Sequence, residues 1–351
     1  MTLRKVLLVF LVFLASTQAE VTPGEFVARP ISKEARGLTG KALVDYVNEN
    51  QPFFKAEYSP ENAQRRLGSL MKKEFFENPI QKEVIANAEE PVINDGIPES
   101  FDARTKWKEC PSITQIRDQS KCGSCWAVSA AETMSDRLCI HSNGTIKTMI
   151  SDTDLLSCCG SSCGDGCEGG SIYRAWVYAK RNGVCSGGQY GTENVCKPYV
   201  FHPCGRHQGQ KYYGECPKHM YKTPVCKRYC QYGYGKRYEN DKFYAKAVYG
   251  IFSFEPVRAI QTNIMKKGPV QAAFTVYEDF VHYKSGIYVH TAGNNTGRHA
   301  VKIIGWGVEN GTKYWTIANS WNTDWGEDGY FRILRGENHC GIEAQVYAGD
   351  F

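Results

Sequence analysis

The cysteines restrict this chain more than any other feature of its sequence. There are fifteen, and all lie between Cys110 and Cys340. Arg4 and Lys5 precede a run of ten apolar residues, and small residues follow up to Ala19. This order predicts a secretory signal peptide over residues 1–19, because spanning a bilayer takes about 20 apolar residues. In an oxidising compartment such cysteines form disulfides, and an odd count leaves at least one free thiol, which catalysis would explain.

Residues 20–96 differ from the rest of the chain, since they carry many charges and no cysteine. Leu43, Val44 and Val47 share one helical stripe, and the residues from Arg65 to Met71 suggest a second helix starting near Pro60. Residues 88–98 have the composition of an exposed linker. We therefore expect a removable inhibitory propeptide over 20–96; the alternative is a small domain that stays attached.

The body, residues 97–351, divides into two parts. Helices are expected over residues 124–140 and 171–180, whereas β signals dominate after residue 236. The expected strands cover 269–277, 301–305, 313–318 and 329–334. This order predicts an α+β fold with a helical lobe beside a β lobe. The net charge of +5 is too small to indicate nucleic-acid binding.

Cys125 is the candidate nucleophile. It ends the run Cys122-Gly123-Ser124-Cys125 and is followed by Trp126, at the start of the first expected helix. A helix N-terminus and a nearby imidazolium both favour the thiolate, so we expect a depressed pKa for this thiol. Three other interpretations are a redox pair of Cys122 with Cys125, half of a zinc site, and two structural disulfide cysteines.

A base and two amides complete the candidate site. His299 enters an apolar strand, and Asn319 lies twenty residues further on, where its carbonyl can fix the imidazole tautomer. Trp321 can shield that hydrogen bond from water. Gln119, six residues before Cys125, can join the Cys125 N–H group as an oxyanion donor.

These motifs resemble those of the cathepsin B-like cysteine proteases of the papain family. The resemblance rests on Arg117-Asp118-Gln119, Cys122-Gly123-Ser124-Cys125-Trp126, Cys158-Cys159-Gly160, Gly164-Asp165-Gly166-Cys167, the run 305–311 and the run 318–326. It implies a papain-like fold with the active-site cleft between a helical lobe and a β-barrel-like lobe. It also implies that Cys125, His299, Asn319 and Gln119 are catalytic, and that maturation cuts just before Ile97. The distance from Cys125 to His299 is 174 residues, a few tens more than the family rule, which matches an insertion over about 185–237.

The resemblance implies six disulfides: Cys110–Cys139, Cys122–Cys167, Cys158–Cys226, Cys159–Cys163, Cys196–Cys230 and Cys204–Cys216. Cys125, Cys185 and Cys340 are left over. Cys340 matches a position that is usually a free thiol in the family, whereas Cys185 has no family counterpart.

The region from about 196 to 230 matches the occluding loop of these enzymes, which makes them dipeptidyl carboxypeptidases as well as endopeptidases. The matching positions make His207 the residue that binds a substrate's C-terminal carboxylate. They place Arg206 where the family has a histidine that ties the loop to Asp118. An Arg206–Asp118 latch is therefore expected; the alternative is a solvated Arg206 and no latch.

Further substrate-binding residues follow from the same resemblance: Gly169, Gly170, Ala300, Trp321 and Gln345. Gln345 occupies the position of an acidic residue that accepts arginine in the second unprimed subsite. A neutral amide there predicts a preference for apolar side chains over arginine.

The expected partners are protein and peptide substrates, the chain's own propeptide and cystatin-type inhibitors. No cofactor, metal, nucleic acid or membrane span is expected. The chain is expected to be a monomer. Delivery to lysosomes or outside the cell, including a gut lumen, fits the signal peptide. The run 314–327 also resembles a pattern of blood-feeding worm proteases, which suggests haemoglobin as a substrate. Asn143, Asn294 and Asn310 are candidate glycosylation sites. Two rival functions are a non-catalytic binding protein on a protease scaffold and a secreted redox protein.

Overall fold

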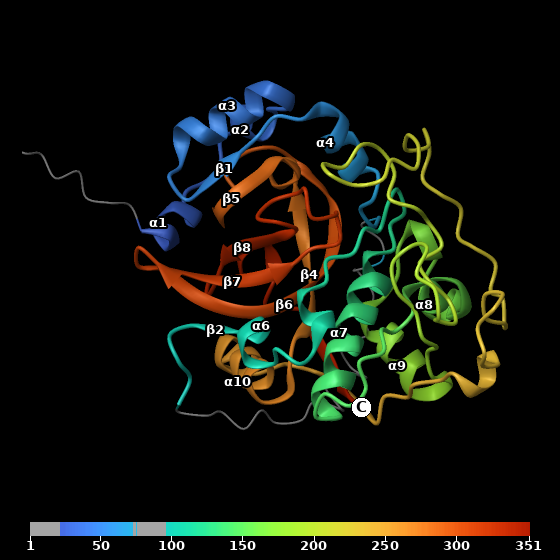
Figure 1. The fold of residues 1–351 in the computed structure, drawn as a ribbon. Coiled ribbons are helices and arrows are strands. Elements are labelled where there is room, and N and C mark those ends of the chain that lie inside the picture. The colour runs from blue at the N-terminus through green and yellow to red at the C-terminus, as the bar shows by residue number, and fades with distance from the viewer. Residues whose placement is uncertain (1–21, 73–74, 76–95) are drawn as a thin grey trace, which may run out of the picture.

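The computed structural model describes residues 22–72, 75 and 96–351 (Figure 1). The expected signal peptide and most of the expected linker lie outside the described residues. Among the described helices, none is long and apolar enough to cross a membrane.

A mixed sheet forms one side of the molecule (Figure 1). Within the described residues it has nine strands in the order β1-β5-β8-β7-β6-β4-β9-β3, and β2 pairs with β6. The strands are β1 (Phe54–Ala56), β2 (Phe101–Asp102), β3 (Ala247–Gly250), β4 (Val270–Tyr277), β5 (Tyr283–Tyr288), β6 (Asn295–Glu309), β7 (Thr312–Ala318), β8 (Tyr330–Leu334) and β9 (Val346–Asp350). All four expected strands are present, and β6 is longer at both ends than the pattern predicted.

The described helices are α1 (Pro23–Val27), α2 (Lys33–Arg36), α3 (Gly40–Asn50), α4 (Pro60–Leu67), α6 (Ala103–Lys106), α7 (Cys125–His141), α8 (Asp152–Cys158), α9 (Ile172–Asn182) and α10 (Pro256–Lys267). Helices α7, α8 and α9 form the other side of the molecule, and the remaining described helices lie around the sheet (Figure 1). Short 3-10 turns lie at η2 (Pro111–Thr114), η3 (Gly160–Ser162), η4 (Gly166–Glu168), η5 (Tyr238–Asn240), η6 (Glu278–His282) and η7 (His339–Gly341). The α+β fold with two lobes is as expected, although α10 was not predicted.

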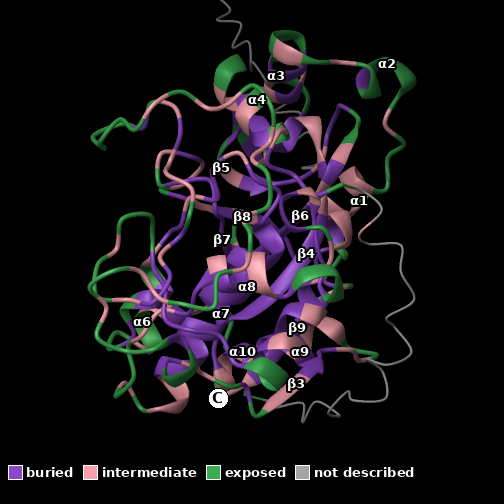
Figure 2. Ribbon diagram, turned by 90° about the vertical axis from the view of Figure 1, so that its right-hand side faces the viewer, coloured by how far each residue is buried: buried purple, intermediate pink, exposed green. Residues whose placement is uncertain are grey.

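Helix α7 joins the two lobes because nearly all of it is buried, from Cys125 to Cys139 (Figure 2). One apolar core surrounds α7, α8 and α9, and a second lies under the sheet and beneath α3. A fully buried Lys302 on β6 pairs with Asp136 of α7 at 2.8 Å. The site described below lies where these two lobes meet.

The N-terminal segment packs against the sheet through α3 and β1, and β1 pairs with β5. The expected helix near 43–47 is present as α3. The second expected helix is wrong in extent: α4 ends at Leu67, and Leu70 and Met71 lie beyond it. Gly68 follows as the C-cap, and Met71 instead forms a β-bridge with Arg298.

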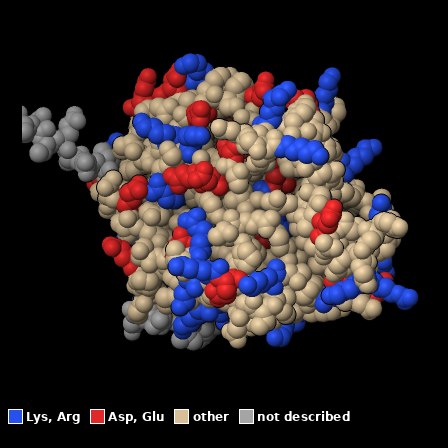
Figure 3. All heavy atoms as spheres, viewed as in Figure 1, with Lys and Arg blue, Asp and Glu red and all other residues tan. Residues whose placement is uncertain are grey.

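Six disulfides cross-link the body, and they are the six pairs that the resemblance implied. Cys125, Cys185 and Cys340 are free. Acidic and basic side chains are interspersed on the face shown in Figure 3. A redox pair of Cys122 with Cys125 does not form, because Cys122 is bonded to Cys167.

Candidate active site

Cys125 is the first residue of α7, and its side chain is fully buried. The preceding loop is held by the Cys122–Cys167 disulfide and by a 2.8 Å hydrogen bond from the Gly123 N–H group to the Cys167 carbonyl. A Cβ atom on Gly123 would lie only 2.3 Å from that carbonyl oxygen. Glycine is therefore required for the loop to bring Cys125 to the helix N-terminus.

His299 lies on β6 with its imidazole fixed from two sides. Its Nε2 atom donates to Oδ1 of Asn319 at 2.7 Å, because an amide oxygen can only accept. The Trp321 ring stacks on the imidazole with centroids 4.7 Å apart. The other nitrogen, Nδ1, is buried without a protein hydrogen-bond partner. This orientation leaves Nδ1 as the nitrogen that can accept a proton.

Cys125 and His299 come together where α7 meets β6. The backbone N–H group of Ala300, next to His299, is directed at the Cys125 sulfur. Burial raises the pKa of the Cys125 thiol to about 12 and lowers the pKa of His299 to about 4. Both groups are therefore neutral in this form, and the expected depressed thiol pKa is wrong for it, since the covered thiol has lost contact with water.

Gln119 is fully buried, and its side-chain amide has a fixed orientation. The oxygen accepts a 2.6 Å hydrogen bond from the Ser320 hydroxyl. The Nε2 group donates to the carbonyl oxygens of Ser69 and Cys122, each at 2.8 Å. Its donor is thus aimed at a carbonyl supplied by the N-terminal segment.

The N-terminal segment crosses between the two lobes at this point. Met71 exchanges backbone hydrogen bonds with Arg298, the residue before His299, at 3.0 and 3.3 Å. On the other side, the Lys72 N–H group donates to the Glu168 carbonyl at 3.1 Å. The Phe75 ring lies where a side chain on Gly169 would project, with φ of +146° at that glycine. The segment therefore covers Cys125 from both lobes.

The remaining expected substrate-binding residues lie around the same point. Ala300 pairs with Ala273 across β6 and β4, and the Ala273 N–H group donates to the Gln345 carbonyl at 3.1 Å. A side chain on Gly170 would collide with the Trp126 ring, at 2.6 Å from it. Gln345 is partly exposed. Ala300 and Gln345 thus lie on the β-lobe side with His299, and Gly170 lies beside Trp126, the residue after Cys125.

The expected Arg206–Asp118 latch is wrong in this structure. His207 is the residue that approaches Asp118, with Nε2 3.3 Å from a carboxylate oxygen, and its Nδ1 lies 3.0 Å from Asp324. Arg206 instead lies over the Tyr212 ring at 4.8 Å. The loop buries the histidine between two carboxylates and leaves the guanidinium at the surface, where its hydration is kept.

Residues that the sequence did not single out complete this contact. Arg65 of α4 donates to the Cys204 carbonyl at 2.8 Å and lies 3.0 Å from Nε2 of His207. Burial raises the pKa of Asp324, but the hydrogen bond and charge of His207, with the charges of Arg65 and Arg66, hold it below its usual range. Asp324 belongs to the quoted run 318–326, so a signal existed for it; none existed for Arg65.

A candidate metal cluster among the described residues consists of Cys185, Cys196 and Asp241. Cys196 is already bonded to Cys230, so its sulfur is not a thiolate ligand. The donor set therefore does not fit a structural zinc site.

The fold, the buried Cys125 at a helix N-terminus and the His299–Asn319 pair are those of a papain-type cysteine protease. The sequence profile described as "Papain family cysteine protease" matches residues 97–349, and the chain belongs to this family. Within it, the chain is cathepsin B-like. It is 49% identical to cathepsin B-like cysteine proteinase 1 of Ostertagia ostertagi, over 94% of this chain and 95% of that protein.

Two other similarities agree. Cathepsin B-like cysteine proteinase 2 of Haemonchus contortus is 50% identical over 93% of this chain and 92% of its own length. The solved structure of proCathepsin B S9 from Trypanosoma congolense superposes with a TM-score of 0.71 at 36% identity, covering 89% of this chain and 98% of that one.

Proposed function

We propose that the chain is a secreted zymogen whose mature form, residues 97–351, cleaves peptide bonds with Cys125 as nucleophile and His299 as base. The observation that carries this proposal is the orientation of His299, which leaves Nδ1 without a protein partner while the N–H group of the next residue, Ala300, is directed at the Cys125 thiol. A non-catalytic protein has no need to fix an imidazole in this way.

In the proposed mechanism, Nδ1 of His299 takes the proton of the Cys125 thiol, and the sulfur attacks the scissile carbonyl carbon. The developing oxyanion accepts hydrogen bonds from Gln119 Nε2 and the Cys125 N–H group. The imidazolium then protonates the leaving amine, and a thioester remains on Cys125. A water molecule deprotonated by His299 hydrolyses the thioester and restores the thiol. Asn319 holds the tautomer throughout.

Residues 22–72 act as the inhibitor in this proposal. Met71 lies against the Cys125 thiol, and Ser69 supplies a carbonyl to the oxyanion donor Gln119. A substrate cannot occupy the same hydrogen-bonding groups until the segment leaves. Removal of the segment also returns water to Cys125 and so permits the thiolate–imidazolium pair.

We propose that the mature enzyme also removes C-terminal dipeptides. The loop residue His207 is held near the site by Asp118 and Asp324, and a protonated imidazole can bind a terminal carboxylate. In the zymogen Arg65 lies against this histidine, so prosegment release would expose it.

The proposed setting is extracellular or lysosomal protein digestion. A gut-specific cysteine proteinase of Caenorhabditis elegans is 47% identical over 89% of this chain, which supports a digestive role. We also propose haemoglobin as a substrate, and this proposal rests on the run 314–327.

Acid processing of the purified zymogen tests the proposal. We expect a product beginning near Ile97 that hydrolyses peptides and is labelled at Cys125 by an active-site thiol reagent. Peptide hydrolysis at an equal rate by the unprocessed chain would contradict the inhibitory role. A processed chain without hydrolysis would favour the binding-protein alternative.

A further inference from the structure

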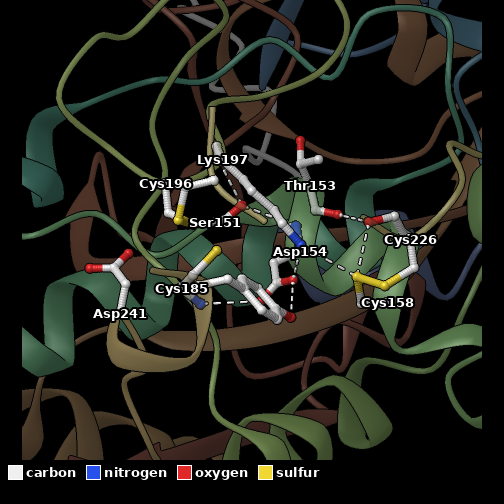
Figure 4. A network of polar contacts seen from close by, with 12 residues as sticks. Ser151, Thr153, Asp154, Cys158, Cys185, Cys196, Lys197, Cys226 and Asp241 are labelled. Carbon is white, nitrogen blue, oxygen red and sulfur yellow. Dashed lines mark hydrogen bonds and ion pairs between the residues drawn. A yellow bond between two sulfur atoms is a disulfide. The ribbon is translucent and has the colours of Figure 1, made fainter. Parts of the chain in front are cut away.

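The sulfur atoms of Cys185 and Cys196 lie close together in the insertion, outside the active site (Figure 4). Cys185 is fully buried and unpaired, and its Sγ lies within 4.8 Å of the Cys196 Sγ. Cys196 is bonded to Cys230, and Cys230 packs against the same small apolar cluster. A free thiol, that of Cys185, therefore lies next to the Cys196–Cys230 disulfide.

The backbone around Cys185 already lies beside that of Cys196. The Lys197 N–H group donates to the Ser186 carbonyl at 3.0 Å, and the Cys196 N–H group donates to the Ser186 hydroxyl at 2.8 Å. Disulfides join residues whose Cα atoms are about 4.4–6.8 Å apart, so the two cysteines must lie on adjacent segments. The two hydrogen bonds of Ser186 hold the segments of Cys185 and Cys196 side by side, as such a bond requires.

We propose that Cys185, Cys196 and Cys230 form an exchange site that supports two alternative disulfides, Cys196–Cys230 and Cys185–Cys196. In the exchange, the Cys185 thiolate attacks the Cys196 sulfur and forms the new bond. The Cys196–Cys230 bond breaks, and Cys230 leaves as a thiolate that takes up the proton lost by Cys185. One disulfide and one thiol are present before and after, so no oxidant or reductant is consumed.

The groups around Cys185 keep this exchange slow, because they disfavour its thiolate. Burial, and next the charge of Asp154, raise the pKa of Cys185, whereas Lys197 and Lys242 oppose the shift. Both lysines are engaged by Asp154, at 2.7 and 2.9 Å. The other titratable groups facing this thiol are Asp241, Tyr178, Tyr234 and Tyr238. The exchange rate should therefore rise with pH and stop in acid, where the thiolate is absent.

The exchange would change how the loop is closed. Cys196 and Cys230 are separated by 34 residues, and the segment between them contains the Cys204–Cys216 loop. After exchange the direct Cys196–Cys230 link is lost, Cys226 stays bonded to Cys158, and Cys230 becomes a partly exposed thiol. The pairing would thus be chosen at neutral pH during secretion and kept once the protein reaches an acidic compartment.

The test uses the full chain with Cys125→Ser, which prevents self-cleavage. Samples are held in native buffer without added thiol at pH values of about 7, 8 and 9, then quenched with acid. After denaturation they are labelled with N-ethylmaleimide in mildly acidic buffer and mapped by peptide mass spectrometry. We expect the labelling of Cys185 to decrease and that of Cys230 to increase by the same amount. The rate of this change should rise about tenfold per pH unit.

Label on Cys340, a free thiol outside the exchange site, reports any general loss of thiols to oxidation and should stay constant. A matched variant carrying Cys185→Ala should show no label on Cys230, and Cys185→Ser serves if the alanine variant does not fold. Label that stays on Cys185 at every pH over hours would overturn the proposal. So would label on Cys230 in the variants without Cys185, because that shows reduction rather than exchange.

Discussion

The side-chain amide of Gln119 donates a 2.8 Å hydrogen bond to the backbone carbonyl of Ser69 in the N-terminal segment. In the proposed mechanism the same Nε2 group stabilises the oxyanion. In the proposed zymogen the segment would therefore inhibit by occupying the hydrogen-bond donor that catalysis uses, in addition to covering the thiol. Because the contact is made by a backbone carbonyl, it does not depend on the Ser69 side chain.

The proposed catalytic pair predicts a large loss of activity on substitution. Cys125→Ser and His299→Ala should each lower kcat of the mature enzyme by about three orders of magnitude or more, since members of such a unit act together. The double variant should be little worse than either single one. Initial rates on a fluorogenic peptide measure this, and an additive loss in the double variant would contradict a shared step.

The contact of Arg65 with the loop predicts faster activation when it is removed. Arg65→Ala deletes the hydrogen bond to the Cys204 carbonyl and the contact with His207. The half-time of self-processing at fixed acid pH should shorten several-fold, because the segment is released more easily. Lys41→Ala is the control, since Lys41 lies on α3 and pairs there with the exposed Asp45. Equal half-times for Arg65→Ala and Lys41→Ala would show that this contact does not restrain the segment.

The neighbours Arg206 and His207 should separate the two proposed activities. His207→Ala should reduce dipeptide release by at least about tenfold while endopeptidase activity is kept, because a charged carboxylate partner is lost. Arg206→Ala should change the ratio of the two activities less than about twofold, since Arg206 contacts a surface tyrosine. Product analysis on one peptide with a free and an amidated C-terminus measures the ratio. A larger effect of Arg206→Ala than of His207→Ala would instead support a latch formed by Arg206.

Gln345 should set the preference of one subsite. Substrates with Phe, Val or Leu at the second unprimed position should have higher kcat/KM than the Arg analogue, because a neutral amide does not repay the desolvation of a guanidinium. Gln345→Glu should shift the preference toward Arg by about tenfold. A peptide library varied at that position tests both expectations. An unchanged preference in the variant would show that Gln345 does not line this subsite.

Glu132 predicts a pH-dependent stability. Burial raises its pKa from 4.5 to about 7, and neither carboxylate oxygen has a protein hydrogen-bond partner. The unfolded chain therefore loses this proton first, and the folded state becomes less stable as pH rises from about 4.5 to 7. The full shift corresponds to a free energy on the order of 3 kcal/mol.

Glu132→Gln should accordingly raise Tm above pH 7 relative to the parent and leave it unchanged near pH 4. Both proteins carry Cys125→Ser, and thermal unfolding is measured across this range. Exposed Glu61→Gln is the control and should show no such trend. A Tm difference that is constant with pH would mean that packing, rather than the charge, sets the cost.

Sequence reasoning found the candidate site because its signals are local. The run around Cys125 and the run around Asn319 each carry a pattern that short-range geometry demands: a glycine-bearing turn into a helix, and an amide next to an aromatic shield. His299 followed from its setting at the start of a strand. The expected helices over 124–140 and 171–180 and the four expected strands were found for a similar reason, since periodicity reports which face is buried.

Other features depended on contacts between distant parts of the chain. The second N-terminal helix stops at Leu67 because Met71 pairs with Arg298, and helical periodicity cannot register a partner 227 residues away. The choice of His207 over Arg206 at Asp118 follows from how the loop folds back, which buries one of two adjacent side chains and leaves the other in water. The raised pKa of Cys125 reflects the cover provided by the N-terminal segment.

The sequence by itself thus determined the chemistry: which thiol, which imidazole and which amides can act together. The tertiary structure alone decided the state of that chemistry, because burial, ion pairing and thiol–disulfide proximity depend on distances that a sequence does not contain. Cys185 illustrates the difference. In the sequence it is an unpaired cysteine eleven residues before Cys196; in the fold its sulfur lies within 4.8 Å of a disulfide that closes the loop region.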